Sequence, residues 1–105
     1  MKKYKVQITN KALSDMEKIY NYISEELQIP EVAIRQYNRI AEKIETLENF
    51  PERVKLMDSK QERSLGIRQM LVDNYSVFFH IINDRVIVTN VLYSKSDISI
   101  RLKDI

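Results

Sequence analysis

The chain has 105 residues, 44% of them hydrophobic and 30% charged, and its 17 basic and 15 acidic side chains leave a net charge of +2. This length and composition are typical of a single globular domain, here residues 1–105, and unlike a disordered chain. The chain has no cysteine, one histidine and one glycine. These counts exclude disulfides, thiolate or histidine-rich metal sites and glycine-rich nucleotide-binding loops, so we expect no cofactor and no metal.

The N-terminal sequence MKKYKVQIT is basic but lacks the apolar run of a secretory signal. No apolar run approaches the roughly 18 residues of a membrane-spanning helix, so we expect no association with a membrane. Together with the absence of cysteine, this predicts a cytoplasmic protein. The small net charge does not require the dense basic face of a nonspecific nucleic-acid binder.

The first half of the chain is predicted to form one strand and two helices. Residues 3–8 alternate polar and apolar side chains, which is the period of a half-buried strand. Thr9 and Asn10 can both cap a helix, and the apolar stripe that follows predicts a helix of about 18 residues. Pro30 suits the first turn of a second helix, and Pro51 ends it. The two apolar stripes predict an antiparallel helical hairpin.

The second half is predicted to form strands after a loop that follows the second helix. Three apolar runs, 67–72, 75–82 and 85–93, are separated by Asp-Asn and Asn-Asp dipeptides. Both residue types tolerate positive φ, so tight hairpins fit there. The predicted fold is α+β in the order β-α-α-β-β-β, an antiparallel sheet with the helical hairpin packed on one face.

Four motifs in this order resemble the RelE/ParE superfamily of toxins from type II toxin–antitoxin systems. They are VQITNKALSDMEKIYNYI, ENFPER, GIRQMLVDNYSVFFHI and RVIVTNVLYSKSD, and the resemblance covers residues 4–97. It implies a growth-inhibiting toxin held silent by a cognate antitoxin encoded beside it, whose extended or helical segment wraps the sheet and helices. It therefore implies a toxin–antitoxin hetero-oligomer.

The superfamily contains at least two unrelated activities. RelE-like members are metal-independent endoribonucleases that cut mRNA on the ribosome, whereas ParE-like members poison DNA gyrase. RelE-type nucleases place an arginine after the strand-opening tyrosine and another after the last strand. Here Ser76 holds the first position, and the only cation near the second is Lys95. Lysine cannot replace a guanidinium fork without loss.

These departures favour ParE-like inhibition of DNA gyrase. Two alternatives stay open: a RelE-like ribosome-dependent mRNA endonuclease, and an inactive module that only binds its antitoxin. Whether the protein is an enzyme is therefore open as well. If it is one, the resemblance implies a metal-independent endoribonuclease.

Four residues are candidates for the functional site. Arg68 lies in the family's Gly-x-Arg motif, with a structural ion pair as the alternative role. His80 is the one imidazole and can titrate near neutral pH, although a polar residue tolerated on a strand is the alternative. Tyr93 and Lys95 end the last strand, where the family keeps functional residues, and an ordinary surface pair is the alternative.

A two-residue turn at Asn83-Asp84 also predicts the strand register. His80 should pair with Ile87, Phe78 with Thr89 and Ser76 with Val91. The predicted open face then contains His80, Arg85, Thr89 and Tyr93. The predicted core face contains Tyr75, Val77, Phe79, Ile81, Val86, Val88 and Leu92.

Overall fold

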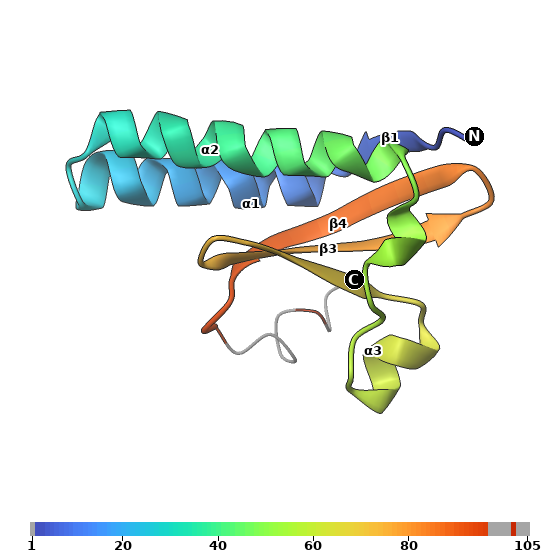
Figure 1. Ribbon diagram of the computed structural model, residues 1–105. Coiled ribbons are helices and arrows are strands. Elements are labelled where there is room, and N and C mark those ends of the chain that lie inside the picture. The colour runs from blue at the N-terminus through green and yellow to red at the C-terminus, as the bar shows by residue number, and fades with distance from the viewer. Residues whose placement is uncertain (1, 97–101, 103–105) are drawn as a thin grey trace.

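The computed structural model describes residues 2–96 and 102. It has a four-stranded sheet with two long helices on one face (Figure 1). The elements are β1 (Lys5–Ile8), α1 (Asn10–Asn21), α2 (Pro30–Glu45), α3 (Lys60–Ser64), β2 (Arg68–Val72), β3 (Tyr75–Ile82) and β4 (Arg85–Tyr93). The predicted α+β class and the order β-α-α-β-β-β are confirmed, and α3 is an addition to them. In the described part of the chain, no helix is long and apolar enough to cross a membrane.

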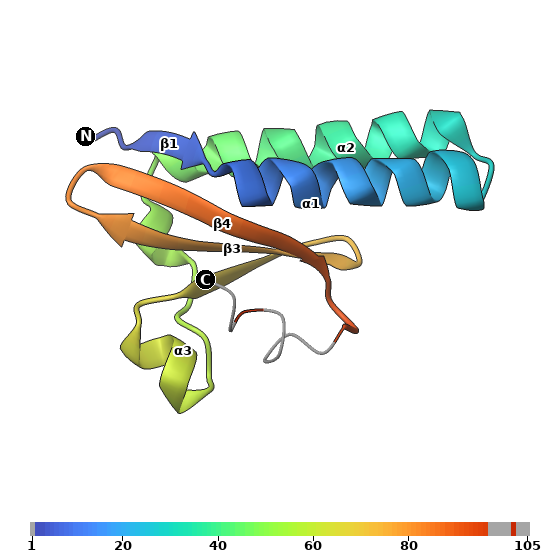
Figure 2. The same ribbon diagram turned by 180° about the vertical axis from the view of Figure 1, so that it is seen from behind.

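The two long helices form the predicted antiparallel hairpin, which is seen from both sides in Figures 1 and 2. The Thr9 hydroxyl accepts a hydrogen bond from the Ala12 amide at 3.1 Å, which caps α1 as expected. A π-helical turn, Tyr22–Glu26, prolongs α1, and Pro30 occupies the first turn of α2. Both helices bury their apolar stripes against the sheet.

The sheet order is β1-β4-β3-β2. The predicted antiparallel pairing is confirmed for β2, β3 and β4, whereas β1 pairs in parallel with β4. No tight turn joins β1 to β4, so turn geometry does not constrain their relative direction. The turn residues Asp73 and Asn83 both have a φ of 55°, as the hairpin prediction requires.

A β-bulge between β3 and β4 changes the predicted register. His80 pairs with Ile87 as predicted, but Phe78 pairs with Asn90 instead of Thr89. Thr89 is the extra residue, and every side chain of β4 beyond it points to the face opposite the one predicted. The predicted pairing of Ser76 with Val91 is therefore also wrong, and Ser76 pairs with Leu92.

The bulge divides the apolar residues of β4 between two clusters. Val91 joins the main core between helices and sheet, and Leu92 faces the other side. There Leu92 packs with Ile67, Phe78 and Leu102 in a second cluster, so the face predicted to be open is partly covered. The rest of the tail from residue 97 lies outside the described residues.

The predicted loop before β2 contains the short helix α3, on the side of the sheet opposite α1 and α2 (Figures 1 and 2). Ser59 precedes this helix, and its hydroxyl donates a hydrogen bond to the Glu62 carboxylate. The spacing of these two residues is that of a capping box, which favours a helix start. This Ser-x-x-Glu spacing is present in the sequence, and the loop prediction overlooked it.

A buried carboxylate on α1 joins the helices to the bulged strand. Asp15 is 5% exposed, and its Oδ2 accepts a hydrogen bond from the Val91 amide at 3.0 Å. The Lys11 ammonium lies 2.6 Å from the other carboxylate oxygen and balances its charge. At the start of α1, the Thr9 amide donates to the Val88 carbonyl at 3.0 Å. Helix α1 is therefore tied to β4 on both sides of the bulge.

We expect Asp15→Ala to lower the free energy of unfolding by about 1–3 kcal/mol, because the buried Val91 amide loses its acceptor. Asp15→Asn keeps an acceptor oxygen and should cost less. Lys18→Met, at an exposed position of the same helix, is the control for the surface charge and should leave stability nearly unchanged. Urea denaturation followed by circular dichroism measures all three variants, and equal losses of stability in Asp15→Ala and Asp15→Asn would contradict this role.

Candidate functional site

The Arg68 side chain is bound to the backbone of the loop before β2. Its Nη1 donates to the Val54 carbonyl at 2.5 Å and to the Glu52 carbonyl at 3.3 Å. Its cross-strand partner is Phe79, a residue of the main core. The guanidinium thus holds the loop against the first residue of β2. This structural role differs from the carboxylate ion pair considered from the sequence.

The Glu52 carboxylate lies close enough to Arg68 for their charges to interact. A hydrogen bond from the Tyr4 hydroxyl holds the pKa of Glu52 below its ordinary value, and the charge of Arg68 contributes less. The same hydrogen bond raises the pKa of Tyr4. The Glu52 carboxylate is therefore an anion stabilised by its neighbours and is poorly suited to act as a general acid.

His80 is half-buried and follows Phe79 on β3, so its side chain lies on the sheet face opposite to Arg68. It is paired with Ile87, as the sequence predicted. No hydrogen bond joins the His80 ring to another side chain within residues 2–96. A general base needs a partner or a substrate proton within about 3 Å.

Tyr93 does not share a face with His80, because the bulge turns it to the helix side of the sheet. It pairs with Tyr75, and the two rings meet edge to face with centroids 5.8 Å apart. Burial, and then the nearby hydroxyls of Tyr93 and Tyr22, raise the pKa of Tyr75. The prediction that Tyr93 lies on the open face is wrong for this reason.

The four candidate residues do not form one site. Tyr93 pairs with Tyr75, which is five residues from His80 along β3, or about 16 Å. Lys95 is exposed and follows the end of β4 by two residues. Arg68 is on the opposite face from His80. Groups that act together on one phosphate must lie within hydrogen-bond reach of it. These four side chains therefore do not surround one common point in this structure.

The position where a RelE-type arginine is expected is also closed. Ser76 is fully buried, and its hydroxyl lies 2.8 Å from the hydroxyl of Ser94. Gln69 donates to the same Ser76 oxygen at 2.9 Å. Gln69, Ser76 and Ser94 are uncharged and are hydrogen-bonded to one another, so they offer no positive charge to a phosphate.

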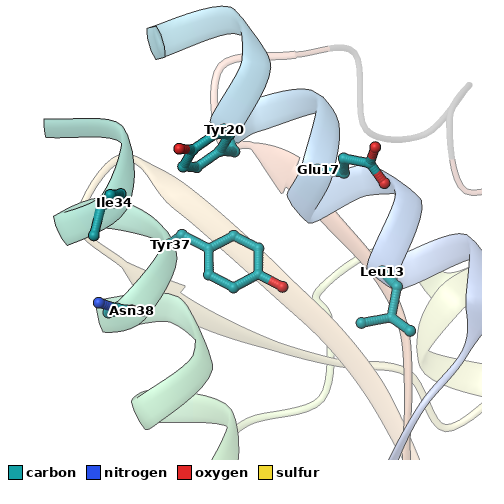
Figure 3. Close-up of a pocket in the computed structure, with 6 residues that line it drawn as sticks. All are labelled: Leu13, Glu17, Tyr20, Ile34, Tyr37 and Asn38. Carbon is teal, nitrogen blue, oxygen red and sulfur yellow. The ribbon is translucent and has the colours of Figure 1, made fainter. Parts of the chain in front are cut away.

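An apolar groove runs between α1 and α2 on their exposed side, with a volume of about 510 Å³ (Figure 3). Leu13 and Ile34 are 44% and 52% exposed, and the Tyr20 and Tyr37 rings pack edge to face with centroids 6.2 Å apart. The residues that line it are Leu13, Glu17, Tyr20, Ile34, Tyr37 and Asn38. We call this surface the helix groove.

The sequence contains a signal for this groove that the helix prediction did not use. Ala12 and Leu13 are adjacent apolar residues, about 100° apart around the helix, so the apolar stripe of this helix is broad and Leu13 lies at its edge. Ala12 faces the core, whereas Leu13 faces the groove. In the same way Ala33 is buried and Ile34 is exposed.

Comparisons with known proteins point to one superfamily. A family model described as the ParE toxin of the type II toxin–antitoxin system parDE matches residues 6–98. A chromosomal ParDE toxin–antitoxin system from P. aeruginosa contains a chain of similar fold, with a TM-score of 0.75, 18% identity and coverage of 88% of this chain and 97% of that one. The RelBE2 toxin–antitoxin complex of Mycobacterium tuberculosis contains another, with a TM-score of 0.61, 19% identity and coverage of 87% and 98%. No curated protein sequence matches this chain.

We expect Arg68→Met to lower the free energy of unfolding by about 1–3 kcal/mol, because two loop carbonyls lose a charged donor. The fraction of the Arg68→Met variant that is folded should inhibit growth as strongly as the unaltered protein. Arg63→Met, on the exposed side of α3, is the matched control and should leave stability nearly unchanged. A stable but non-toxic Arg68→Met protein would contradict the structural role.

Proposed function

Because the chain belongs to the ParE toxin family of type II toxin–antitoxin systems, we propose that it arrests growth by inhibiting DNA gyrase and that a cognate antitoxin neutralises it. We choose gyrase over mRNA as the target because Arg68, His80 and Tyr93 lie far apart in the structure. Cleavage of RNA needs groups of this kind around one phosphate. Inhibition of an enzyme by binding needs no such convergence. We place this activity in the cytoplasm, where gyrase acts.

Two other functions remain candidates. An mRNA endonuclease is favoured by the structural similarity to the chain of the RelBE2 complex, although 19% identity supports a shared fold alone. An inactive antitoxin-binding module is favoured by the same lack of convergent catalytic groups. The experiment below separates these candidates from gyrase inhibition.

Pulsed induction without the antitoxin, followed by labelled-precursor incorporation, identifies the target. We expect DNA synthesis to stop first, together with an SOS response and inhibition of supercoiling by purified gyrase. Protein synthesis stopping first, with cleaved mRNA, would instead identify an endonuclease. Continued growth would identify a binding module.

Tyr93 and Lys95 stay candidates for contact with the target, since both are exposed at the end of β4. We expect Tyr93→Ala and Lys95→Ala to weaken growth arrest while the melting temperature changes little. Tyr93→Phe keeps the ring packed against Tyr75 and removes only the hydroxyl. It therefore distinguishes the contribution of the hydroxyl from that of the ring. If a variant loses toxicity only because it unfolds, that residue has no functional role.

We further propose that the helix groove is where the antitoxin docks. Its lining is largely apolar and combines the two exposed aliphatic side chains Leu13 and Ile34 with the edge-to-face pair of tyrosines, Tyr20 and Tyr37. A groove between two helices suits the apolar face of a partner helix. The chains of similar fold come from toxin–antitoxin systems, which supports a partner of this kind.

We expect Ile34→Glu to weaken antitoxin affinity by at least about tenfold, because a carboxylate would be buried among apolar groups. The melting temperature of the free toxin should stay nearly unchanged, since the side chain is exposed. Leu65→Glu, which alters another exposed apolar residue next to α3, is the control and should bind normally. Isothermal titration calorimetry checks both, and normal binding by Ile34→Glu would argue against the groove.

A further inference from the structure

Three tyrosines from three different elements meet at one end of the sheet. Tyr93 at the end of β4 pairs with Tyr75 at the start of β3, and their rings are in edge-to-face contact. Tyr22 is the first residue of the π-helical turn that follows α1. It lies seven residues after Asp15, whose carboxylate accepts the hydrogen bond from the Val91 amide of β4. The place of Tyr22 relative to β4 therefore follows from helix and strand geometry.

This geometry brings Tyr22 close to the other two tyrosines. Seven residues of an α-helix make almost two complete turns, so Tyr22 lies on the same side of α1 as Asp15 and about 10 Å further along its axis. Tyr93 lies two residues beyond Val91, on the same side of β4 and about 7 Å further along it. Since α1 and β4 run in the same direction (Figure 2), both steps lead to the same end of the molecule.

Tyr22, Tyr75 and Tyr93 form a surface that we call the tyrosine cluster. Tyr22 and Tyr93 are 54% and 43% exposed, whereas Tyr75 is partly buried. Burial first, and then the nearby hydroxyls of Tyr93 and Tyr22, raise the pKa of Tyr75, in agreement with their close placement. Within residues 2–96 and 102, no hydrogen bond occupies the hydroxyl of Tyr22 or of Tyr93. Two rings and two hydroxyls can therefore contact a partner.

The charges around the tyrosine cluster are balanced. Asp73, in the turn before Tyr75, is already bonded to Arg39. A phosphate backbone is held by closely spaced cations, which this mixture of charges does not provide. Tyrosines surrounded by charges of both signs are instead typical of interfaces between proteins. Two lysines and two glutamates, all exposed, adjoin the cluster: Lys18, Glu25, Glu26 and Lys95.

We propose that Tyr22 is a third contact residue for the target and that the tyrosine cluster binds an extended segment of gyrase. The rings pack against apolar side chains of that segment, and the hydroxyls donate hydrogen bonds to its backbone carbonyls. This inference rests on the proposed function, which places Tyr93 and Lys95 at the contact with the target, and the cluster continues that surface onto the helices. Because Tyr22 follows a helix and Tyr93 ends a strand, the surface depends on the link that Asp15 makes between the two layers.

The test compares the affinity of Tyr22→Ala for purified gyrase, in the absence of DNA, with that of the unaltered toxin. We expect the affinity to fall by at least about tenfold, since tyrosines at protein interfaces often supply much of the binding energy. Antitoxin affinity should stay within about twofold, because Tyr22 does not line the helix groove. Phe50→Ala is the matched control, since it removes an exposed aromatic ring near the start of β1, at the opposite end of the sheet, and should bind gyrase normally.

Two further variants separate the contributions of the Tyr22 side chain. Tyr22→Phe keeps the ring and should lose less affinity than Tyr22→Ala. Tyr22→Leu keeps an apolar side chain, and should also lose affinity if the alanine variant proves unstable. Normal gyrase affinity in all three variants would overturn the proposal, and so would binding that requires DNA or a loss confined to the antitoxin.

Failure of this inference is distinguishable from failure of the proposed function. If the unaltered toxin neither binds nor inhibits gyrase, the proposed function itself is wrong, and this inference is wrong with it. If the unaltered toxin inhibits supercoiling by gyrase and folded Tyr22→Ala inhibits it equally, the proposed function stands and only the role of the tyrosine cluster is wrong.

Discussion

The hydrogen bond from the Val91 amide to the buried Asp15 carboxylate connects the two layers of this protein. It reaches β4 just beyond the bulge, where the regular strand pairing is interrupted. Lys11 neutralises the carboxylate from the solvent side, and the Thr9 amide adds a contact to Val88. Because a buried amide without an acceptor is costly, this geometry fixes both the position of α1 and the register of β4.

The bulge at Thr89 then determines what each side of the sheet presents. It turns Val91 into the main core, sends Leu92 to the second cluster and places Tyr93 beside Tyr75. The face predicted to be open is therefore closed near Leu92 and stays accessible nearer the β3–β4 turn. The position of Tyr93, which is proposed to contact the target, follows from this division.

The fold itself is compatible with more than one activity, so the site residues have to decide the function. In this chain the position of one RelE-type arginine is taken by a buried serine, Ser76, which is bonded to Ser94. The arginine of the Gly-x-Arg motif, Arg68, holds a loop through two carbonyls. Both observations favour inhibition by binding over cleavage of RNA.

The sequence by itself determined the order of the elements and the three strands of the second half, because these depend on local periodicity and turn residues. The family was indicated by the resemblance of four sequence motifs in their order along the chain. The sequence also located the paired His80 and Ile87, which lie close to the turn. Beyond Thr89 the sequence could not decide which face a residue takes, because one inserted residue reverses the alternation and only contacts with α1 show where it lies. The separation of Arg68, His80 and Tyr93 was likewise decided by the tertiary structure, since distances between faces and strand ends follow from packing.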